Sequence, residues 1–374
     1  MSYFLTEEQE LFRKTVREFV DKEVRPRAAE IDETDEFPMD LWKRCAELGL
    51  TGISYPEEYG GLGADMVTEL MVMEEIGKAC PTLALILDVN LYTIGEILGL
   101  GTTEQKEKFV PDLASGRRIG GIASTQSQGS SNMAEWGIGA QLEGDHYVVN
   151  VTKVFQTNSL HSGTIVLSVM SEEGLIKLIV DKANTPGIET GHIERKMGLK
   201  GSDTGTIVFN NVKVPVENKL ESLPFGKYST VPFMDIGAIC LGIAEEAYEK
   251  TKNYLLQRTK SFRPLASFNN ISIDLAKIAA DIELARSLIY TAGRLFDTRG
   301  EAGYLPFICK AWTSEMAVRN VSRCIEFYGN VGYSEETGLT RLLRDVQGLC
   351  IAEGSTGLLY AVMANMAGLP AALA

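Results

Sequence analysis

This chain has few histidines, and its cysteines are not closely spaced in the sequence. The three histidines, His146, His161 and His192, stand alone, which gives little support to a zinc site or a histidine-centred catalytic triad. The six cysteines lie far apart and form no C-x-x-C pair. We therefore expect reduced, mostly buried thiols and no metal site.

Basic residues are also in deficit. The 374 residues include 36 lysines and arginines against 50 aspartates and glutamates, a formal net charge of −14. This balance argues against nucleic acid or an anionic membrane surface as the main partner. The first residues show neither a secretory signal nor a transit-peptide pattern, so we expect a cytoplasmic protein.

The stretch 354–374 has no formal charge and has to be considered as a membrane anchor. Glycine, asparagine and proline interrupt it, and much of it is alanine. A spanning helix needs about 20 strongly apolar residues. We expect a buried terminal helix here and no membrane span.

Helical patterns occupy the first third of the chain. Thr6 and Gln9 form a capping-box pattern, and apolar residues then recur on one face, which predicts a long helix over 6–30. Further helices are expected around 39–48, 67–80, 86–99 and 103–115. The turn-rich segment 56–63 lacks the G-x-G-x-x-G spacing of a dinucleotide-binding fold, so we expect no nicotinamide Rossmann domain.

The middle of the chain changes to short β-rich runs, and the last third is helical again. The β-rich runs are 147–151, 164–169, 178–180 and 206–214. From about 236 onward, an apolar stripe from Ile271 to Ile289 indicates a bundle core or a subunit interface. The predicted fold class is α+β: an N-terminal helical domain (1–118), a middle antiparallel β domain (119–222) and a C-terminal four-helix bundle (223–374).

A series of short motifs runs along the whole chain. They are Leu5–Gln9, Pro56–Gly63, Lys196–Thr204 with Val212–Pro215, Leu241–Ala244, Arg258 with Phe262, Tyr328–Tyr333, and Glu353–Ser355. In this order they resemble the acyl-CoA dehydrogenases, flavoenzymes with an α–β–α arrangement. The segment Asn90–Tyr92 with Ile97 and Leu98 looks most like the short-chain, butyryl-type branch.

The resemblance implies a reaction. It is the flavin-dependent α,β-dehydrogenation of an acyl-CoA thioester, or the reverse reduction of an enoyl-CoA, with FAD N5 as the hydride acceptor. Glu353 is the implied α-proton base, and its backbone N–H helps to polarise the thioester carbonyl. A dry pocket can raise the pKa of such a carboxylate enough for the task. Without the resemblance, Glu353 reads as an ordinary solvated loop carboxylate.

The resemblance also implies FAD-binding residues. Those expected beside the flavin are Thr125, Ser131, Phe155, Thr157 and Ser355. Those expected to reach the diphosphate or adenosine half, in part from a neighbouring subunit, are Arg258, Asn269, Glu326 and Gly329. Taken singly, each has a structural interpretation, with Phe155 as β core, Arg258 as a surface charge and Asn269 as a helix cap. Substrate positions fall on Ser131, Phe233 and Gly354.

Several positions depart from the family pattern. The flavin loop 125–132 keeps only its threonine and one serine, and phenylalanine replaces a common tryptophan at 155. Glu326 and Asn269 replace glutamines, and Glu326 adds negative charge near a diphosphate unless it is paired or points away. Phe233 replaces an arginine that meets the CoA moiety. Small residues beside the base, Ala352 and Gly354, suggest room for a substrate bulkier than butyryl.

These departures leave alternatives beside the homotetrameric enzyme that the family implies. The chain can be one subunit of a hetero-oligomer with a paralogue and a composite or degenerate FAD site, or a flavin-free protein that binds acyl thioesters. An acyl-CoA thioester is the implied substrate, although a carrier-protein thioester is also open. An electron-transferring flavoprotein is the expected redox partner.

Overall fold

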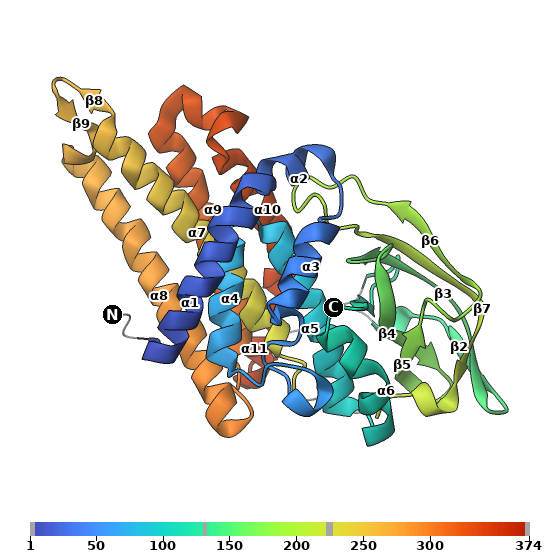
Figure 1. The fold of residues 1–374 in the computed structure, drawn as a ribbon. Helices are drawn as coiled ribbons and strands as arrows, with labels where there is room; N and C mark the ends of the chain where they lie inside the picture. Colours follow the sequence, from blue (N-terminus) through green and yellow to red (C-terminus); the bar gives the residue numbers. More distant parts are fainter. Residues whose placement is uncertain (1–3, 130–132, 222–226, 371–374) are drawn as a thin grey trace.

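Two helical regions pack together and a β domain lies at one side of them in this computed structural model, which describes residues 4–129, 133–221 and 227–370 (Figure 1). The first region contains α1 (Glu7–Phe19), α2 (Ala28–Thr34), α3 (Met39–Glu47), α4 (Met66–Ala79), α5 (Pro81–Leu100) and α6 (Thr103–Ala114). The α+β class and the order of the three regions are as predicted from the sequence.

The predicted capping box opens α1. The Thr6 side chain accepts from the backbone N–H of Gln9, and the Gln9 side chain accepts from that of Thr6. The long helix predicted over 6–30 is interrupted by a π turn at Val20–Val24 and a 3-10 turn at Arg25–Arg27. Pro26 lies in this second turn, where its missing N–H prevents a regular helical hydrogen bond.

Helices α4 and α5 form the centre of the molecule. Every residue of α4 is buried, as is nearly all of α5. Among the described residues, α5 is the one helix long and apolar enough to cross a membrane, and 89% of its apolar window is buried inside the protein. Such burial is that of a core helix.

The β domain consists of two packed sheets, one with the strand order β1–β4–β5 and the other β2–β3–β7–β6. The strands are β1 (Ile119–Ala123), β2 (Ala140–Glu143), β3 (His146–Gln156), β4 (Ser162–Ser171), β5 (Gly174–Asp181), β6 (Ile188–Ile193) and β7 (Gly205–Pro215). All pairs are antiparallel except β1 with β4, which is parallel. The prediction of a wholly antiparallel domain was wrong at this pair, because β1 enters from α6 and does not form a hairpin with β4.

The C-terminal region is a bundle of α7 (Val231–Gln257), α8 (Asn269–Arg299), α9 (Leu305–Tyr328) and α10 (Leu339–Leu349). A small hairpin of β8 (Thr259–Lys260) and β9 (Arg263–Pro264) joins α7 to α8. The predicted stripe along α8 is bundle core, since Leu275, Ile278, Ile282 and Ile289 are buried within this chain. Short 3-10 turns occupy Leu50–Gly52, Glu57–Tyr59, Met133–Glu135, Val216–Asn218, Leu265–Ser267, Gly329–Tyr333 and Glu335–Thr337.

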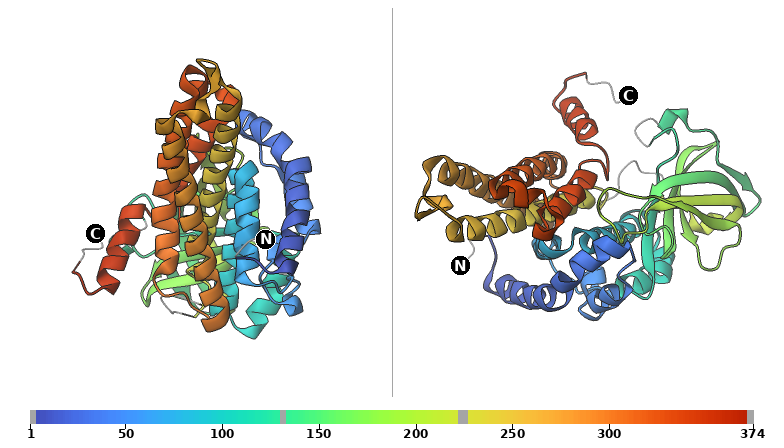
Figure 2. Two further views of the ribbon diagram at one scale, coloured as in Figure 1. Left: turned by 90° about the vertical axis from the view of Figure 1, so that its left-hand side faces the viewer. Right: turned by 90° about the horizontal axis from the view of Figure 1, so that it is seen from above.

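The last helix, α11 (Thr356–Met366), contacts α9 along one side and otherwise projects from the body of the molecule (Figure 2). Of its residues only Leu359 is buried, whereas Tyr360 and Met366 are exposed. The expected buried terminal helix is therefore wrong for the single chain. All six cysteines are free, and five of them are buried.

Candidate active site

Glu353 lies in the short turn that joins α10 to α11. Its backbone is left-handed, with φ 53°, and Gly354 follows at φ 89°. A glutamate in this conformation is uncommon and is held there by its surroundings. Ser355 caps α11, because its hydroxyl accepts from the backbone N–H of Leu358 at 3.3 Å.

A buried lysine holds this turn. Lys310 on α9 has no solvent exposure, and its Nζ donates to the backbone oxygen of Cys350 at 2.9 Å and to that of Gly354. These two carbonyl groups lie on either side of Glu353 in the sequence. The lysine therefore fixes the loop from both ends and places a positive charge near the Glu353 carboxyl group.

The Glu353 carboxyl group has a raised pKa. Burial raises its pKa to about 7, the positive charge of Lys310 opposes that rise, and Glu96 adds to it. Part of the residue reaches solvent, but the carboxyl group is surrounded by protein. A carboxylate with a pKa near neutrality is suited to act as a general base.

Helix α10 is anchored to the β domain just before this turn. The Asp345 carboxyl group accepts from the backbone N–H of Leu199 at 2.6 Å, and burial raises the Asp345 pKa to about 6. Arg344 donates to Asp32 at 2.8 Å and to the backbone oxygen of Met197 at 2.9 Å. These bonds join α10 to α2 and to the segment after β6, and so set the position of the Glu353 turn.

The predicted flavin loop lies against β3. The backbone oxygen of Thr125 accepts from Val154 N–H at 3.0 Å. Phe155 has φ 55° and is 62% exposed, which a phenylalanine of the β core would not be. Thr157, two residues further on, is half-buried. Ser131 lies outside the described residues.

Two further observations fit a planar polar cofactor at this loop. The Gln126 side-chain Nε2 is buried without a hydrogen-bond partner in the described residues, so it is a donor available to a ligand. Lys153 is fully buried, donates to Ser124 O at 3.2 Å, and lies 4.0 Å from the centre of the Trp136 ring. Burial lowers the Lys153 pKa to about 7. An exposed aromatic ring at Phe155 and one unpaired donor at Gln126 are compatible with an isoalloxazine.

The other predicted cofactor residues lie at the far end of the bundle. Arg258 ends α7 beside the β8–β9 hairpin, Asn269 begins α8, and both are exposed. Gly329 ends α9 with φ 62°. Figure 1 shows the hairpin at the upper left and the β domain at the right. One chain therefore does not bring this set together with Thr125 and Phe155.

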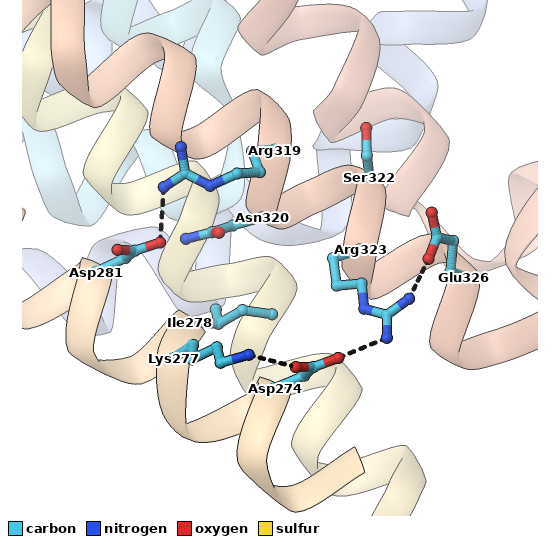
Figure 3. Close-up of a pocket in the computed structure, with 9 residues that line it drawn as sticks. All are labelled: Asp274, Lys277, Ile278, Asp281, Arg319, Asn320, Ser322, Arg323 and Glu326. Atoms are coloured by element: carbon cyan, nitrogen blue, oxygen red, sulfur yellow. Dashed lines mark hydrogen bonds and ion pairs between the residues drawn. The ribbon is translucent and has the colours of Figure 1, made fainter. Parts of the chain in front are cut away.

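Glu326 belongs to this distant set and is paired. Arg323 donates to Glu326 and, at 2.6 Å, to Asp274 on α8, which also accepts from Lys277 at 3.1 Å (Figure 3). These residues line an open cleft of about 710 Å³ between α8 and α9. The negative charge of Glu326 is thus compensated within the chain.

Phe233, at the position where the family pattern has an arginine, lies at the start of α7. Its ring centroid is 5.1 Å from that of Phe307 on α9. Both rings belong to a small apolar cluster with Leu359 of α11. Phe233 thus packs near the Glu353 turn and provides no cation there.

Three protein-family models match successive parts of the chain. The acyl-CoA dehydrogenase N-terminal domain matches residues 6–117, the middle domain 121–212 and the C-terminal domain 234–367. The chain belongs to the acyl-CoA dehydrogenase family. It is an oxidoreductase of that family, whose cofactor is FAD.

Relatives of this acyl-CoA dehydrogenase cover nearly its full length. It is 34% identical to a short-chain specific acyl-CoA dehydrogenase of Clostridium acetobutylicum, over 95% of this chain and 97% of the relative. It is 32% identical to an acryloyl-CoA reductase (NADH) of Anaerotignum propionicum, over 98% and 95%. The structure of butyryl-CoA dehydrogenase from Megasphaera elsdenii superposes with a TM-score of 0.92 at 29% identity, covering 98% of this chain and 100% of that one.

Sequence reasoning missed Lys310 and Lys153. The available signal was a single charge inside an apolar run, as in Phe307–Trp312 around Lys310 and Val151–Phe155 around Lys153. Lysine is almost never fully buried without a partner. A lysine in such a run therefore indicates a buried ammonium group with a specific task.

Proposed function

We propose that this protein catalyses the α,β-dehydrogenation of an acyl-CoA thioester, or its reverse, with Glu353 as the base that removes the α-proton. The observation that supports this role most directly is the turn itself. Glu353 has a pKa near neutrality, lies in a strained left-handed conformation, and is held by the buried Lys310. Strained, pKa-shifted residues gather at functional sites.

The protein groups have separate tasks in this proposal. Glu353 takes the α-proton onto its carboxylate, and its backbone N–H orients and polarises the thioester carbonyl, which makes that proton more acidic. Lys310 keeps the turn in place and preserves part of the carboxylate's negative charge. Gly354, with φ 89°, allows the backbone to turn close beside the thioester. FAD, when bound, supplies the acceptor for the β-hydride at N5.

We propose that Thr125, Phe155, Thr157 and Gln126 hold the flavin end of FAD, with Ser131 and Ser355 beside it. Phe155 offers an exposed ring and Gln126 an unpaired donor. Arg258, Asn269, Glu326 and Gly329 then hold the diphosphate and adenosine end of the FAD bound to a second subunit. This assignment follows from their position at the far end of the same chain (Figure 1).

A site shared between subunits requires an oligomer, and we propose a cytoplasmic homotetramer with the domain limits 1–118, 119–222 and 223–374. The acyl-CoA dehydrogenase and acryloyl-CoA reductase relatives support both reaction directions. For the dehydrogenase direction, the electron acceptor we propose is an electron-transferring flavoprotein. Ser131 and Gly354 would then face the thioester, and Phe233 would lie where the family pattern has its CoA-binding arginine.

The experiment is the visible spectrum of the purified protein loaded with FAD, before and after addition of a panel of saturated acyl-CoA thioesters without oxygen. The proposal is supported if one thioester bleaches the flavin band of the wild type but does not bleach that of Glu353→Gln. Failure of all thioesters to bleach a bound flavin contradicts the dehydrogenase direction, and reoxidation of reduced flavin by the enoyl-CoA then tests the reverse one.

A further inference from the structure

Lys153 on β3 is a buried cation that forms no ion pair with any of the described carboxylates. The residue has no solvent exposure, and burial alone lowers its pKa to about 7. Its Nζ donates to the backbone oxygen of Ser124 at 3.2 Å and lies 4.0 Å from the centre of the Trp136 ring. An ammonium group held in a protein interior without a counter-ion is costly. A carbonyl oxygen and an aromatic face offset only part of that cost, as the lowered pKa shows.

The buried lysines among the described residues are of two kinds. Lys78 forms an ion pair with Glu245 at 2.9 Å. Lys310 and Lys153 instead donate to backbone oxygens, Lys310 to those on either side of Glu353. Lys310 thus holds one loop of the proposed active site. Lys153 makes the same kind of contact with a second loop.

This second loop is the predicted flavin loop. Ser124 directly precedes Thr125, whose backbone oxygen accepts from Val154 N–H at 3.0 Å. Two consecutive residues of β3 therefore hold the start of the loop, Lys153 through its side chain and Val154 through its backbone. Gln126 follows at once, and its buried side-chain Nε2 has no hydrogen-bond partner among the described residues.

Trp136 connects Lys153 to the other side of Gln126. The Trp136 side chain is buried, and its Nε1 donates to the backbone oxygen of Gly129 at 2.9 Å. The Gly129 N–H in turn donates to the backbone oxygen of Gln126 at 2.8 Å. One ammonium group thus contacts the loop before Gln126 directly and, through Trp136, after it. We call Lys153, Ser124 and Trp136 the clamp.

The geometry of β3 turns Lys153 inward and Phe155 outward. Residues two apart in a regular strand face the same side of the sheet. Here the pairing with β7 shifts register between Lys153 and Gln156, and Phe155 has φ 55°. Lys153 is therefore inside the β domain, whereas Phe155, two residues further on, presents its ring to the outside.

We propose that Lys153 is a positioning residue for FAD, whose ammonium group holds both sides of the segment 124–129 so that the Gln126 amide faces the flavin. This inference rests on the proposed flavin site. The positive charge strengthens both the hydrogen bond to the carbonyl oxygen and the contact with the indole ring. A neutral amine lacks that charge. The protein with a protonated Lys153 should therefore bind FAD more tightly than the protein with a neutral one.

The surroundings of Lys153 allow its titration to be followed. The segment 124–129, β1 and β4 contain no ionisable side chain, and β7 places Ile207 opposite Lys153. The ionisable side chains on β3 itself, on β2 and β7 beside it, and next to Trp136 are exposed or half-buried: His146, Glu143, Lys213 and Glu135. None of them contributes to the shift of the Lys153 pKa.

The test is a titration of the full-length, FAD-free protein with FAD at pH 6 and pH 9, followed by flavin fluorescence. Lys153→Met keeps a long side chain and removes the charge. At pH 6 it should raise the FAD dissociation constant by about tenfold or more, the scale of one charge-assisted hydrogen bond. At pH 9, where the wild-type amine is neutral, the difference should be about threefold or less. Lys213→Met, at an exposed position on β7, is the control and should bind FAD like the wild type at both pH values.

Two further measurements separate positioning from folding. The melting temperature of FAD-free Lys153→Met should not fall, because the substitution breaks no ion pair. Trp136→Phe keeps an aromatic ring in the clamp but loses the bond to Gly129. It should therefore weaken FAD binding by about threefold or more at both pH values, and unchanged binding would contradict the clamp.

The outcomes also separate this inference from the proposed function. If Lys153→Met binds FAD like the wild type at pH 6, the inference is overturned. It is equally overturned if the variant weakens binding by the same factor at pH 6 and pH 9, because the lysine then acts through its shape and not its charge. If the variant behaves as expected although no thioester bleaches the wild-type flavin, the inference stands and the proposed reaction fails. A wild type that binds no FAD overturns both.

Discussion

Lys310 donates from Nζ to the backbone oxygen of Cys350 at 2.9 Å, three residues before Glu353, and to the oxygen of Gly354 directly after it. The lysine is fully buried, and burial lowers its pKa. Its ammonium group is therefore committed to the turn that carries the proposed base. The position and the proton affinity of Glu353 both depend on this one side chain.

Lys310→Met tests that dependence. Because Lys310 opposes the rise of the Glu353 pKa, its removal should move the acidic limb of the kcat/KM profile to higher pH. Loss of the tether should also lower kcat by about tenfold to a hundredfold, through misplacement of the base. The pH dependence of flavin bleaching, at limiting thioester for kcat/KM and at saturating thioester for kcat, measures both. An unchanged acidic limb, with only lower stability, would assign Lys310 a purely structural role.

Glu353→Gln should remove dehydrogenation while leaving the complex intact. The amide cannot accept the α-proton, so bleaching should slow by about a thousandfold or more, within the range of general-base catalysis. FAD content and thioester binding, measured from the flavin spectrum, should remain near those of the wild type. Glu315→Gln, an exposed carboxylate on the same helix as Lys310, is the control. Retained bleaching in Glu353→Gln would require another base.

In the wild type, the same reaction should depend on pH near neutrality. The raised Glu353 pKa of about 7 means that the base is protonated, and inactive, in acid. The rate of bleaching should therefore rise with pH through about 7 and level off above it. A profile that stays flat down to pH 5 would contradict a base with this pKa.

Phe155→Ala should weaken FAD binding without weakening the fold. The ring is 62% exposed, so its removal leaves little cavity in the β domain, and the melting temperature of the FAD-free protein should change little. Loss of an aromatic surface against the cofactor should raise the FAD dissociation constant by about tenfold. Leu142→Ala, at an equally exposed position on β2, should affect neither quantity. If Phe155→Ala still binds FAD tightly, the flavin does not lie against Phe155 in the β domain.

The fold, and the position of Glu353 between two helices, could be predicted from the sequence, because motif order and periodicity are local properties of the chain. The predicted limits of the first helix were wrong near Pro26, where one missing backbone N–H changes the type of turn. The predicted burial of α11 was wrong for another reason. Its apolar residues suit burial, but the single chain does not cover them. The sequence of a helix does not show which other surface packs against it.

The meeting of three buried carboxyl groups on α4 (Glu69), α5 (Asp88) and α7 (Asp235) could not have been predicted either. Glu69, Asp88 and Asp235 are far apart in the sequence, and each alone looks like a surface carboxylate among 50 acidic residues. Only the packing of three helices brings these carboxyl groups within hydrogen-bonding reach of one another. The same holds for Lys310 and Cys350, which are 40 residues apart.

The buried carboxyl group of Glu69 should make the stability of the protein depend on pH. Burial raises the pKa of Glu69 from its ordinary value to about 7. Below the ordinary value, both folded and unfolded chains hold the proton, and the group costs nothing. As pH rises through that value, the unfolded chain loses its proton first, so unfolding becomes more favourable until pH passes about 7. Wild-type stability should therefore decrease relative to Glu69→Gln between about pH 5 and pH 8.

Melting temperatures of the two proteins at several pH values measure this difference, which should grow with pH in favour of Glu69→Gln. Glu74→Gln is the matched control on the same helix. Since Glu74 accepts from Arg286 and Tyr290, its amide variant should be less stable than the wild type throughout this range. If Glu69→Gln instead behaves like Glu74→Gln, Glu69 is ionised and paired in the folded protein, and burial does not raise its pKa.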